Sequence, residues 1–232
     1  MIILPDVHGR DFWKDAVKTK DETIIFLGDY VDPYDYEGIT KDKALENFKE
    51  LLEYKKSNPS AILLLGNHDF MYMDPEHKRW SCRHDFGNDS EITRLFLDNK
   101  DLFQVGYSQV INGTNYIFSH SGILKNWLEE HKDLFGENPR ISETIDKANK
   151  YYQEWNKDFI LSLRDISWYR GGWAEYGSMI WADIREHEGN YEEGVYQIFG
   201  HSQLKDQPII TEHFADLDCR RAFRFNGKIE EL

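Results

Sequence analysis

Short apolar runs recur along the chain, and each one ends in a loop that begins with polar residues. A short apolar run bounded by glycine is typical of a buried strand, because strands covered on both faces are almost continuously hydrophobic. The pattern therefore predicts five buried strands, at Ile2–Leu4, Thr23–Leu27, Ala61–Leu65, Tyr116–Phe118 and Val195–Phe199.

An amphipathic helix is predicted between the second and third runs, over 41–56. Leu45, Phe48, Leu51 and Leu52 share one face of it. Strand–helix–strand alternation predicts an α/β fold with a mostly parallel sheet and right-handed crossovers. Because open α/β sheets bind ligands beyond the carboxyl ends of their strands, the polar loops lie where a site is expected.

The rest of the chain has a different pattern. Asn112-Gly113 is a strong two-residue turn signal, and it predicts a hairpin of Val105–Ile111 with Asn115–Ser119. Apolar residues at helical spacing predict a short helix over Glu91–Asn99 and one long helix over Ser142–Arg164. Short strands are expected at Phe214–Leu217 and Ala222–Phe225. Without a repeat or a linker, we expect one domain over 1–232, with a helical insertion at about 124–180.

Charge narrows the possible partners. The 232 residues include 28 Lys+Arg and 42 Asp+Glu, which gives a formal net charge of −14. Duplex nucleic acid and anionic membranes both bind basic surfaces, so neither is expected as a partner. No stretch approaches the ~20 apolar residues of a membrane span, and the first residues do not have the pattern of a signal peptide. We expect a cytoplasmic protein.

The polar loops carry metal-binding side chains in a series. A single Asp-x-His motif is a weak signal, but the recurrence of such side chains after five apolar runs is not. Carboxylate, imidazole and amide donors without thiolate suit Mn, Fe, Zn or Co. One catalytic tetrahedral site uses about three protein ligands. Six candidate ligands therefore suit two metal ions. Two such ions can bind the attacking and leaving oxygens of an in-line displacement at phosphorus. The candidate ligands are Asp6, His8, Asp29, Asn67, His120 and His201.

This series resembles that of the calcineurin-like metallophosphoesterases. The stretches Gly28-Asp29-Tyr30-Val31-Asp32 and Gly66-Asn67-His68-Asp69 are similar to the branch of Ser/Thr protein phosphatases and bacterial dinucleoside-tetraphosphatases. The motifs extend from Asp6 to His201, which is nearly the whole chain. The resemblance implies a four-layer αββα sandwich of two mixed sheets flanked by helices, with the site at the strand ends.

The resemblance also implies a role for each residue. Asp6 and His8 would hold the first metal ion, and Asp29 would bridge the two ions. Asn67, His120 and His201 would complete the second site. A hydroxide between the ions would be the nucleophile, with its pKa lowered by them. His68 would protonate the leaving oxygen, and Asp32 would pair with His68 and keep it protonated. Alternatives remain: Asp32 as a structural turn residue, and His68 as a phosphate-binding group that transfers no proton.

Two positions depart from the pattern of that family. Pro33 stands where the protein phosphatases have an arginine, and proline cannot bind phosphate bidentately. Arg170 and Arg83 are the candidate substitutes for substrate binding, and Arg185 is a weaker one. Gln203 stands where many phosphodiesterases and nucleases have a second histidine, which favours the phosphatase-like branch.

Three tryptophans at 168, 173 and 181 flank Arg170. Trp side chains of this kind either pack in a core or form the wall of a pocket that stacks a nucleobase or an aromatic side chain. The sequence leaves both interpretations open.

We therefore expect a phosphoesterase with two divalent ions (Mn, Fe or Zn) that acts on a compact phosphorylated substrate. Phosphomonoesters, phosphoproteins and dinucleoside polyphosphates all fit such a site. The alternatives are a metal-binding nucleotide sensor without turnover and a nuclease or phosphodiesterase. The charge of −14 does not exclude phosphate chemistry, because two divalent ions make their own pocket locally positive.

Overall fold

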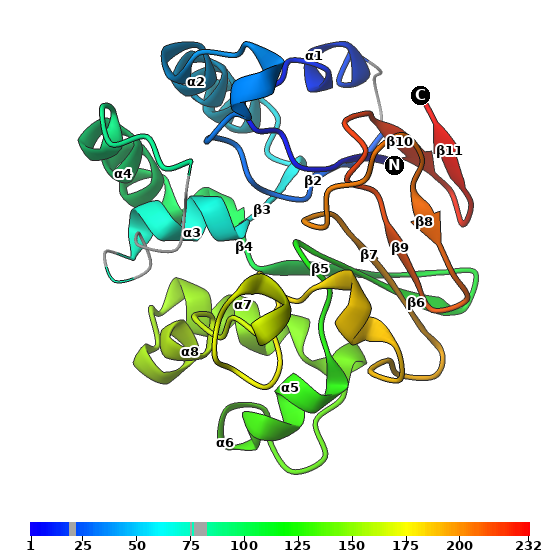
Figure 1. Ribbon diagram of the computed structural model, residues 1–232. Coiled ribbons are helices and arrows are strands. Elements are labelled where there is room, and N and C mark those ends of the chain that lie inside the picture. The colour runs from blue at the N-terminus through cyan, green and yellow to red at the C-terminus, as the bar shows by residue number, and fades with distance from the viewer. Residues whose placement is uncertain (19–21, 75, 77–82) are drawn as a thin grey trace. The chain divides into compact units, whose positions relative to one another are not determined.

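The chain divides into two compact units in a computed structural model, which describes residues 1–18, 22–74, 76 and 83–232. The first unit comprises Met1–Phe103 and Arg220–Leu232, and the second comprises Gln104–Cys219. Figure 1 colours the chain by residue number, so the two segments of the first unit can be followed separately. Each unit is built around its own sheet.

The first unit contains a six-stranded mixed sheet in the order β11-β10-β1-β2-β3-β4. Strands β1, β2 and β3 are parallel neighbours, and β10 pairs antiparallel with β1. The strands of this sheet are β1 (Ile2–Leu4), β2 (Ile24–Phe26), β3 (Ile62–Leu64), β4 (Phe103–Gln104), β10 (Phe223–Phe225) and β11 (Ile229–Glu231). Its helices are α1 (Trp13–Ala16), α2 (Lys41–Ser57), α3 (Asn67–Met73) and α4 (Asp89–Asp98), with 3-10 turns at Asp35–Glu37 and Lys100–Leu102.

Aromatic rings join the helices of this unit to its strands. Phe48 of α2 lies 4.5 Å from Phe96 of α4 between ring centroids, and Tyr30 stacks on Phe48 at 5.7 Å. All three rings are buried, as is Phe103. Because a buried aromatic side chain removes a large apolar surface from water, this cluster fixes the loop that carries Tyr30 against α2.

The second unit contains a five-stranded mixed sheet in the order β5-β6-β7-β9-β8. Here β6, β7 and β9 are parallel neighbours, while β5 and β8 are antiparallel edge strands. The strands are β5 (Gly106–Ile111), β6 (Thr114–Ser119), β7 (Val195–Phe199), β8 (Ile209–Ile210) and β9 (Phe214–Asp216). The helices are α5 (Lys125–Glu130), α6 (Lys132–Phe135), α7 (Ile145–Gln153) and α8 (Lys157–Ser162), with 3-10 turns at Ile141–Glu143, Trp168–Arg170 and Ile184–His187.

The strand predictions are confirmed, as is the expected fold class of two mixed sheets with flanking helices. All five apolar runs form strands, and the last coincides with β7. The hairpin forms as predicted, with Asn112 and Gly113 at φ 52° and 84°. Positive φ at both central residues is the geometry of a type I′ turn, for which Asn-Gly is preferred.

The prediction of one helix over Ser142–Arg164 is wrong. The segment forms a 3-10 turn and two short helices, α7 and α8, which are separated at Glu154–Asn156. Trp155 adopts φ 52°, a left-handed conformation that ends α7. The Asn156 side chain then accepts a hydrogen bond from the backbone N–H of Phe159 at 3.0 Å and so caps α8.

A second difference concerns the segment after β3. The polar residues Asn67, His68 and Asp69 do not lie in a loop but form the first turn of helix α3. The helix begins at once because the Asp69 carboxylate accepts a hydrogen bond from the backbone N–H of Gly66, the residue before the helix, at 2.8 Å. No helix among the described residues is both long and apolar enough to cross a membrane.

Candidate metal centre

Three neighbouring strands of the first unit deliver polar side chains to one edge of its sheet. Asp6 follows β1, Asp29 follows β2 and Asn67 follows β3. Since β1, β2 and β3 are parallel and adjacent, their carboxyl ends lie side by side. This is the edge at which open α/β sheets bind ligands.

Backbone hydrogen bonds hold the first two loops together beyond the sheet. The N–H of His8 donates to the carbonyl of Asp29 at 2.6 Å, and that of Gly9 donates to Tyr30 at 3.0 Å. His8, Asp29 and Asp32 have φ of 44°, 53° and 56°. Left-handed backbone at non-glycine residues is uncommon, and it clusters at functional sites.

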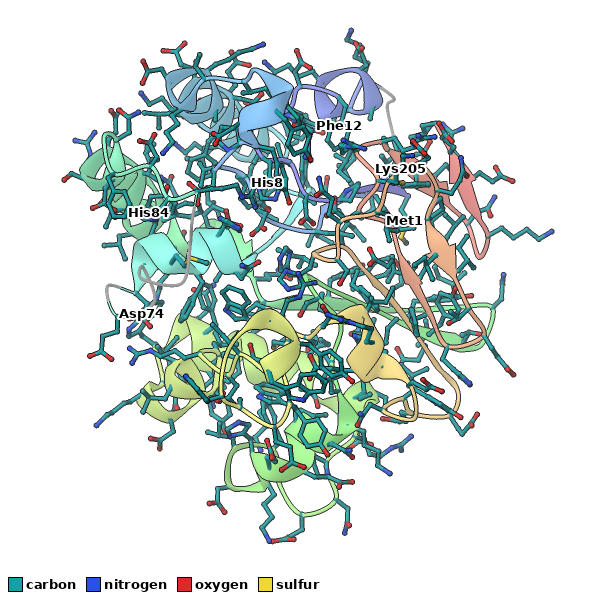
Figure 2. The ribbon with its side chains drawn as sticks, viewed as in Figure 1. Met1, His8, Phe12, Asp74, His84 and Lys205 are labelled. Carbon is teal, nitrogen blue, oxygen red and sulfur yellow. The ribbon has the colours of Figure 1, made fainter. Side chains whose placement is uncertain are left out.

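Asp6, His8 and Asp29 form a buried cluster. Each offers one ligand atom, and these atoms lie within 4.8 Å of one another. His8 Nε2 is 3.5 Å from Asp29 Oδ2 and 3.8 Å from Asp6 Oδ2, and all three side chains are about 1% exposed. Figure 2 labels His8 at this position.

The chemistry of this cluster fits a divalent cation. His8 Nδ1 donates to the carbonyl of Val31 at 2.9 Å, so its Nε2 carries a lone pair toward the carboxylates. Burial and the neighbouring Arg83 lower the pKa of His8, which keeps it as the neutral imidazole that binds metals. Burial, together with the charge of Asp6, raises the pKa of Asp29 to about 7. A cation between the carboxylates would relieve that repulsion.

Asp69 organises the loops around the cluster. Its carboxylate accepts hydrogen bonds from the backbone N–H groups of Asp29 (2.8 Å), Tyr30 (2.9 Å) and Gly66 (2.8 Å). A carboxylate at the start of α3 also suits the positive end of the helix dipole. Asp69 therefore supports these loops through hydrogen bonds to their backbone. Asn67, the first residue of α3, is buried.

Gly66 leaves room for the Asp29 carboxylate. A Cβ at Gly66 would stand 2.1 Å from Asp29 Oδ1. The same Oδ1 accepts a hydrogen bond from the backbone N–H of His68 at 2.9 Å. Only glycine fits at the first position of the Gly-Asn-His-Asp motif, because the Asp29 carboxylate lies so close to its backbone.

His68 and Asp32 lie in contact. His68 Nδ1 donates to Asp32 Oδ2 at 2.7 Å, and the two side chains are 11% and 0% exposed. The hydroxyl of Tyr72 donates to the other oxygen of Asp32 at 2.5 Å. His68 and Tyr72 stand one helical turn apart on α3, so both oxygens of Asp32 are held by one helix.

Arg83 completes this group. Its Nη1 donates to the backbone carbonyl of Asp32 at 2.9 Å, and its Nη2 donates to His68 Nε2 at 2.9 Å. The guanidinium also lies 3.6 Å above the Tyr34 ring. The Arg83 guanidinium therefore lies against the backbone of Asp32, the residue that directly precedes Pro33.

The second unit contains two neighbouring buried histidines. His120 follows β6 and His201 follows β7, which are parallel neighbours. His120 Nε2 lies 3.1 Å from His201 Nδ1, and both side chains are buried. His201 has φ 70°. Two imidazole nitrogens turned to the same point either share a proton or, both deprotonated, provide two donors for a metal ion.

Arg170 lies beside this pair. Its Nε makes an ion pair with Asp183 Oδ2 at 2.8 Å, and its Nη2 donates to the hydroxyl of Ser202 at 2.6 Å. Ser202 directly follows His201. Gln203 is exposed.

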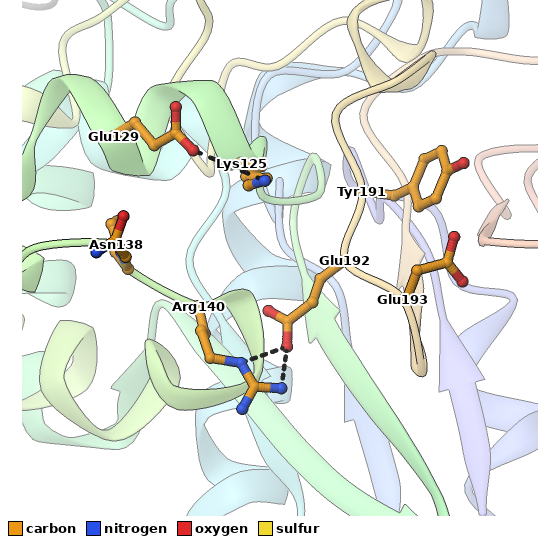
Figure 3. Close-up of a pocket in the computed structure, with 8 residues that line it drawn as sticks. Lys125, Glu129, Asn138, Arg140, Tyr191, Glu192 and Glu193 are labelled. Carbon is orange, nitrogen blue, oxygen red and sulfur yellow. Dashed lines mark hydrogen bonds and ion pairs between the residues drawn. The ribbon is translucent and has the colours of Figure 1, made fainter.

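A pocket of about 410 Å³ in the second unit lies apart from these residues (Figure 3). Arg140 makes an ion pair with Glu192 at 2.8 Å in its wall, and Lys125 lies 3.8 Å from Glu129. None of the predicted site residues lines this pocket, and its basic side chains are already neutralised by acidic partners. We therefore place no site there.

Sequence reasoning missed Tyr72 and Tyr34 in the site. Tyr72 would have been found if Asn67-His68-Asp69 had been predicted as a helix, because it stands at i+4 from His68. Tyr34 gives no signal, since its contact with Arg83 joins segments far apart in the chain. Trp80 and Cys82, which precede Arg83 in the sequence, lie outside the described residues.

Comparison with known proteins supports the same conclusion. A family model described as calcineurin-like phosphoesterase matches residues 3–213 of the 232. No curated protein sequence matches the chain.

Proposed function

Because the chain belongs to the calcineurin-like phosphoesterases, which are metal-dependent hydrolases of phosphoester bonds, we propose that it hydrolyses compact phosphate esters with two divalent ions. The observation that carries this proposal is the buried cluster of Asp6, His8 and Asp29. The ions, when bound, supply Lewis acidity and lower the pKa of a water molecule. Mn, Fe and Zn suit the donors, which include no thiolate.

The proposed ligands are those that the family resemblance implies. Asp6 and His8 hold the first ion, and Asp29 is shared. Asn67, His120 and His201 hold the second. Buried imidazoles whose other nitrogen is engaged are typical metal ligands, and His8 has this arrangement through its contact with Val31.

His68 is proposed to donate the proton to the leaving oxygen. With Nδ1 directed to Asp32, the proton would be donated from Nε2. In the structure Nε2 accepts from Arg83, so proton donation requires the guanidinium to turn from Nε2 to the substrate phosphate. Asp32 accepts the hydrogen bond from Nδ1 and so orients the ring. An acid held by a carboxylate in this way typically contributes about 10²–10⁴-fold to the rate.

Arg83 is proposed to bind the phosphate in place of the arginine that Pro33 lacks. Its guanidinium is fixed by Tyr34 and the Asp32 carbonyl at the same place as His68 Nε2. Arg170 is committed to Asp183 and Ser202, so we assign it the weaker role of holding the loop after His201. A net charge of −14 disfavours long polyanions and favours a compact substrate.

The test is a panel of phosphate esters assayed with the protein loaded in turn with Mn²⁺, Zn²⁺ and Fe²⁺. We expect hydrolysis of p-nitrophenyl phosphate with at least one ion, and at least a 10³-fold loss in Asp29→Asn. Asp101→Asn is the matched control, because Asp101 is exposed. If the metal-loaded protein hydrolyses no phosphate ester but retains nucleotides, it is a sensor. Cleavage of oligonucleotides alone would make it a nuclease.

A further inference from the structure

His84 is a buried side chain of the first unit that the proposed reaction does not use. It is 1% exposed and directly follows Arg83 in the sequence, and Figure 2 labels it. Its ring stacks on that of Tyr72, with the centroids 4.2 Å apart at an interplanar angle of 22°. Its Nε2 donates to Asp89 Oδ1 at 2.8 Å, because an ionised carboxylate can only accept. The stack and the hydrogen bond together define the position of His84.

The backbone around His84 is anchored as well. Lys41 Nζ donates to the carbonyl of His84 at 2.9 Å. The backbone N–H of Asp85 donates to the Tyr72 hydroxyl at 2.8 Å. The Asp85 carboxylate in turn accepts from two backbone N–H groups of the turn that follows, both at 3.1 Å. The segment that begins at Arg83 is therefore held by its backbone and by the ring of His84.

This segment places Arg83 against the pair of His68 and Asp32. The guanidinium donates to the Asp32 carbonyl and to His68 Nε2, each at 2.9 Å. Tyr72, on which His84 stacks, donates through its hydroxyl to the Asp32 carboxylate. His84 thus packs on a residue that binds Asp32 and is covalently bonded to the arginine that binds both members of the pair. One buried group of side chains fixes the backbone of the arginine and the carboxylate beside it.

We propose that His84 is a positioning residue: it fixes the backbone that carries Arg83 and so keeps the guanidinium within reach of the substrate phosphate. This inference rests on the proposed function, in which Arg83 binds phosphate. An arginine whose backbone and side chain are ordered before binding loses less entropy when the phosphate arrives. Without His84 this ordering would occur on binding, which weakens affinity roughly two- to tenfold.

The test is inhibition by inorganic phosphate of p-nitrophenyl phosphate hydrolysis by the metal-loaded protein. His84→Ala should raise the Ki of phosphate and the KM of the substrate roughly two- to tenfold, while kcat and bound metal change much less. His84→Gln should retain most of the affinity, because its amide nitrogen can take the place of Nε2. Nothing is lost at Nδ1, which has no hydrogen-bond partner among the described residues.

His131→Ala is the matched control. His131 also pairs with an aspartate, Asp165, at 2.6 Å and contacts an aromatic ring, that of Trp127. It lies in the second unit and outside the segment that carries Arg83. The Ki of phosphate should therefore stay at the wild-type value.

Arg83→Ala distinguishes positioning from general damage to the fold. It removes the guanidinium, so it should raise the Ki of phosphate more than His84→Ala does. In the Arg83→Ala background, His84→Ala should add nothing, because the effects of residues that act through one another are not additive. A Ki that is unchanged in His84→Ala, or that rises further in the double variant, would overturn the proposal.

Asp89→Ala is a second variant, for use if His84→Ala does not fold. It removes the hydrogen bond of His84 and leaves its ring on Tyr72, so it should also raise the Ki, and an unchanged Ki would again overturn the proposal. Failure of the proposed function is a separate result, namely no hydrolysis of p-nitrophenyl phosphate by the metal-loaded protein. The Kd of inorganic phosphate is then measured by calorimetry, and the same comparisons between variants decide.

Discussion

Asp32 is held at both oxygens by residues of one helix, and this gives Tyr72 a role that its burial alone would not. We expect Tyr72→Phe to let Asp32 and His68 move out of alignment, because a hydrogen bond to a charged group is lost. The kcat for alkyl phosphates, which need a proton at the leaving oxygen, should fall roughly tenfold. The kcat for p-nitrophenyl phosphate, which has a good leaving group, should change much less.

Comparing kcat for the two substrates distinguishes a role of Tyr72 in positioning His68 from a role in the stability of the fold. KM and bound metal should be unchanged in Tyr72→Phe. Tyr54→Phe is the control, because Tyr54 is half-buried in the same unit and packs against Trp13. An equal loss with both substrates would show that Tyr72 supports only the fold.

Residues of the candidate centre could be predicted from the sequence where each directly follows a predicted strand of the same sheet. Asp6 and Asp29 follow predicted parallel strands, so their proximity follows from topology. Arg83 was one of several equivalent arginines in the sequence. Only the contacts with Tyr34 and His68 distinguish it, and such contacts between distant segments leave no local pattern.

At the scale of elements, the break between α7 and α8 depends on Asn156. We expect Asn156→Ala to lower the free energy of unfolding by about 1 kcal/mol, because the N-terminus of α8 loses its cap. Denaturant unfolding measures this, and Asn156→Asp should retain most of the stability. A variant as stable as the wild type would mean that the cap contributes nothing.

The same break explains which elements could be predicted. Strands of three to six residues were found because each is a short apolar run bounded by turn residues. The pattern over Ser142–Arg164 has helical spacing throughout, and it carries no sign that Trp155 turns left-handed. The first turn of α3 was missed because its polar residues suit a loop equally well. Its helical state depends on the tertiary contacts of Asp69.

At the scale of the whole molecule, His187 makes stability depend on pH. It is 1% exposed, stacks on Phe199, and donates through Nε2 to the carbonyl of Ser121 at 3.0 Å. Burial lowers the pKa of His187 from the usual value of about 6.5 to about 4. The unfolded chain therefore binds this proton more readily, so its contribution is complete above pH 6.5 and is lost as the pH falls toward 4.

We expect this histidine to remove about 3 kcal/mol of stability between pH 6.5 and 4, since one pKa unit corresponds to about 1.4 kcal/mol. Denaturant unfolding of the wild type and of His187→Gln at several pH values isolates the effect from other groups. The loss on acidification should be smaller in the variant by this amount. Parallel pH profiles for the two proteins would contradict the assignment.

The central claim is that the buried Asp and His side chains hold the ions that hydrolysis needs. Its most direct test is activity against p-nitrophenyl phosphate as metal-stripped protein is titrated with Mn²⁺, with bound metal measured in parallel. The account predicts no activity without metal and a rise that reaches its plateau at two ions per chain. It also predicts that Asp29→Asn binds less metal and stays inactive. Full activity in the metal-stripped protein, or in Asp29→Asn, would contradict it.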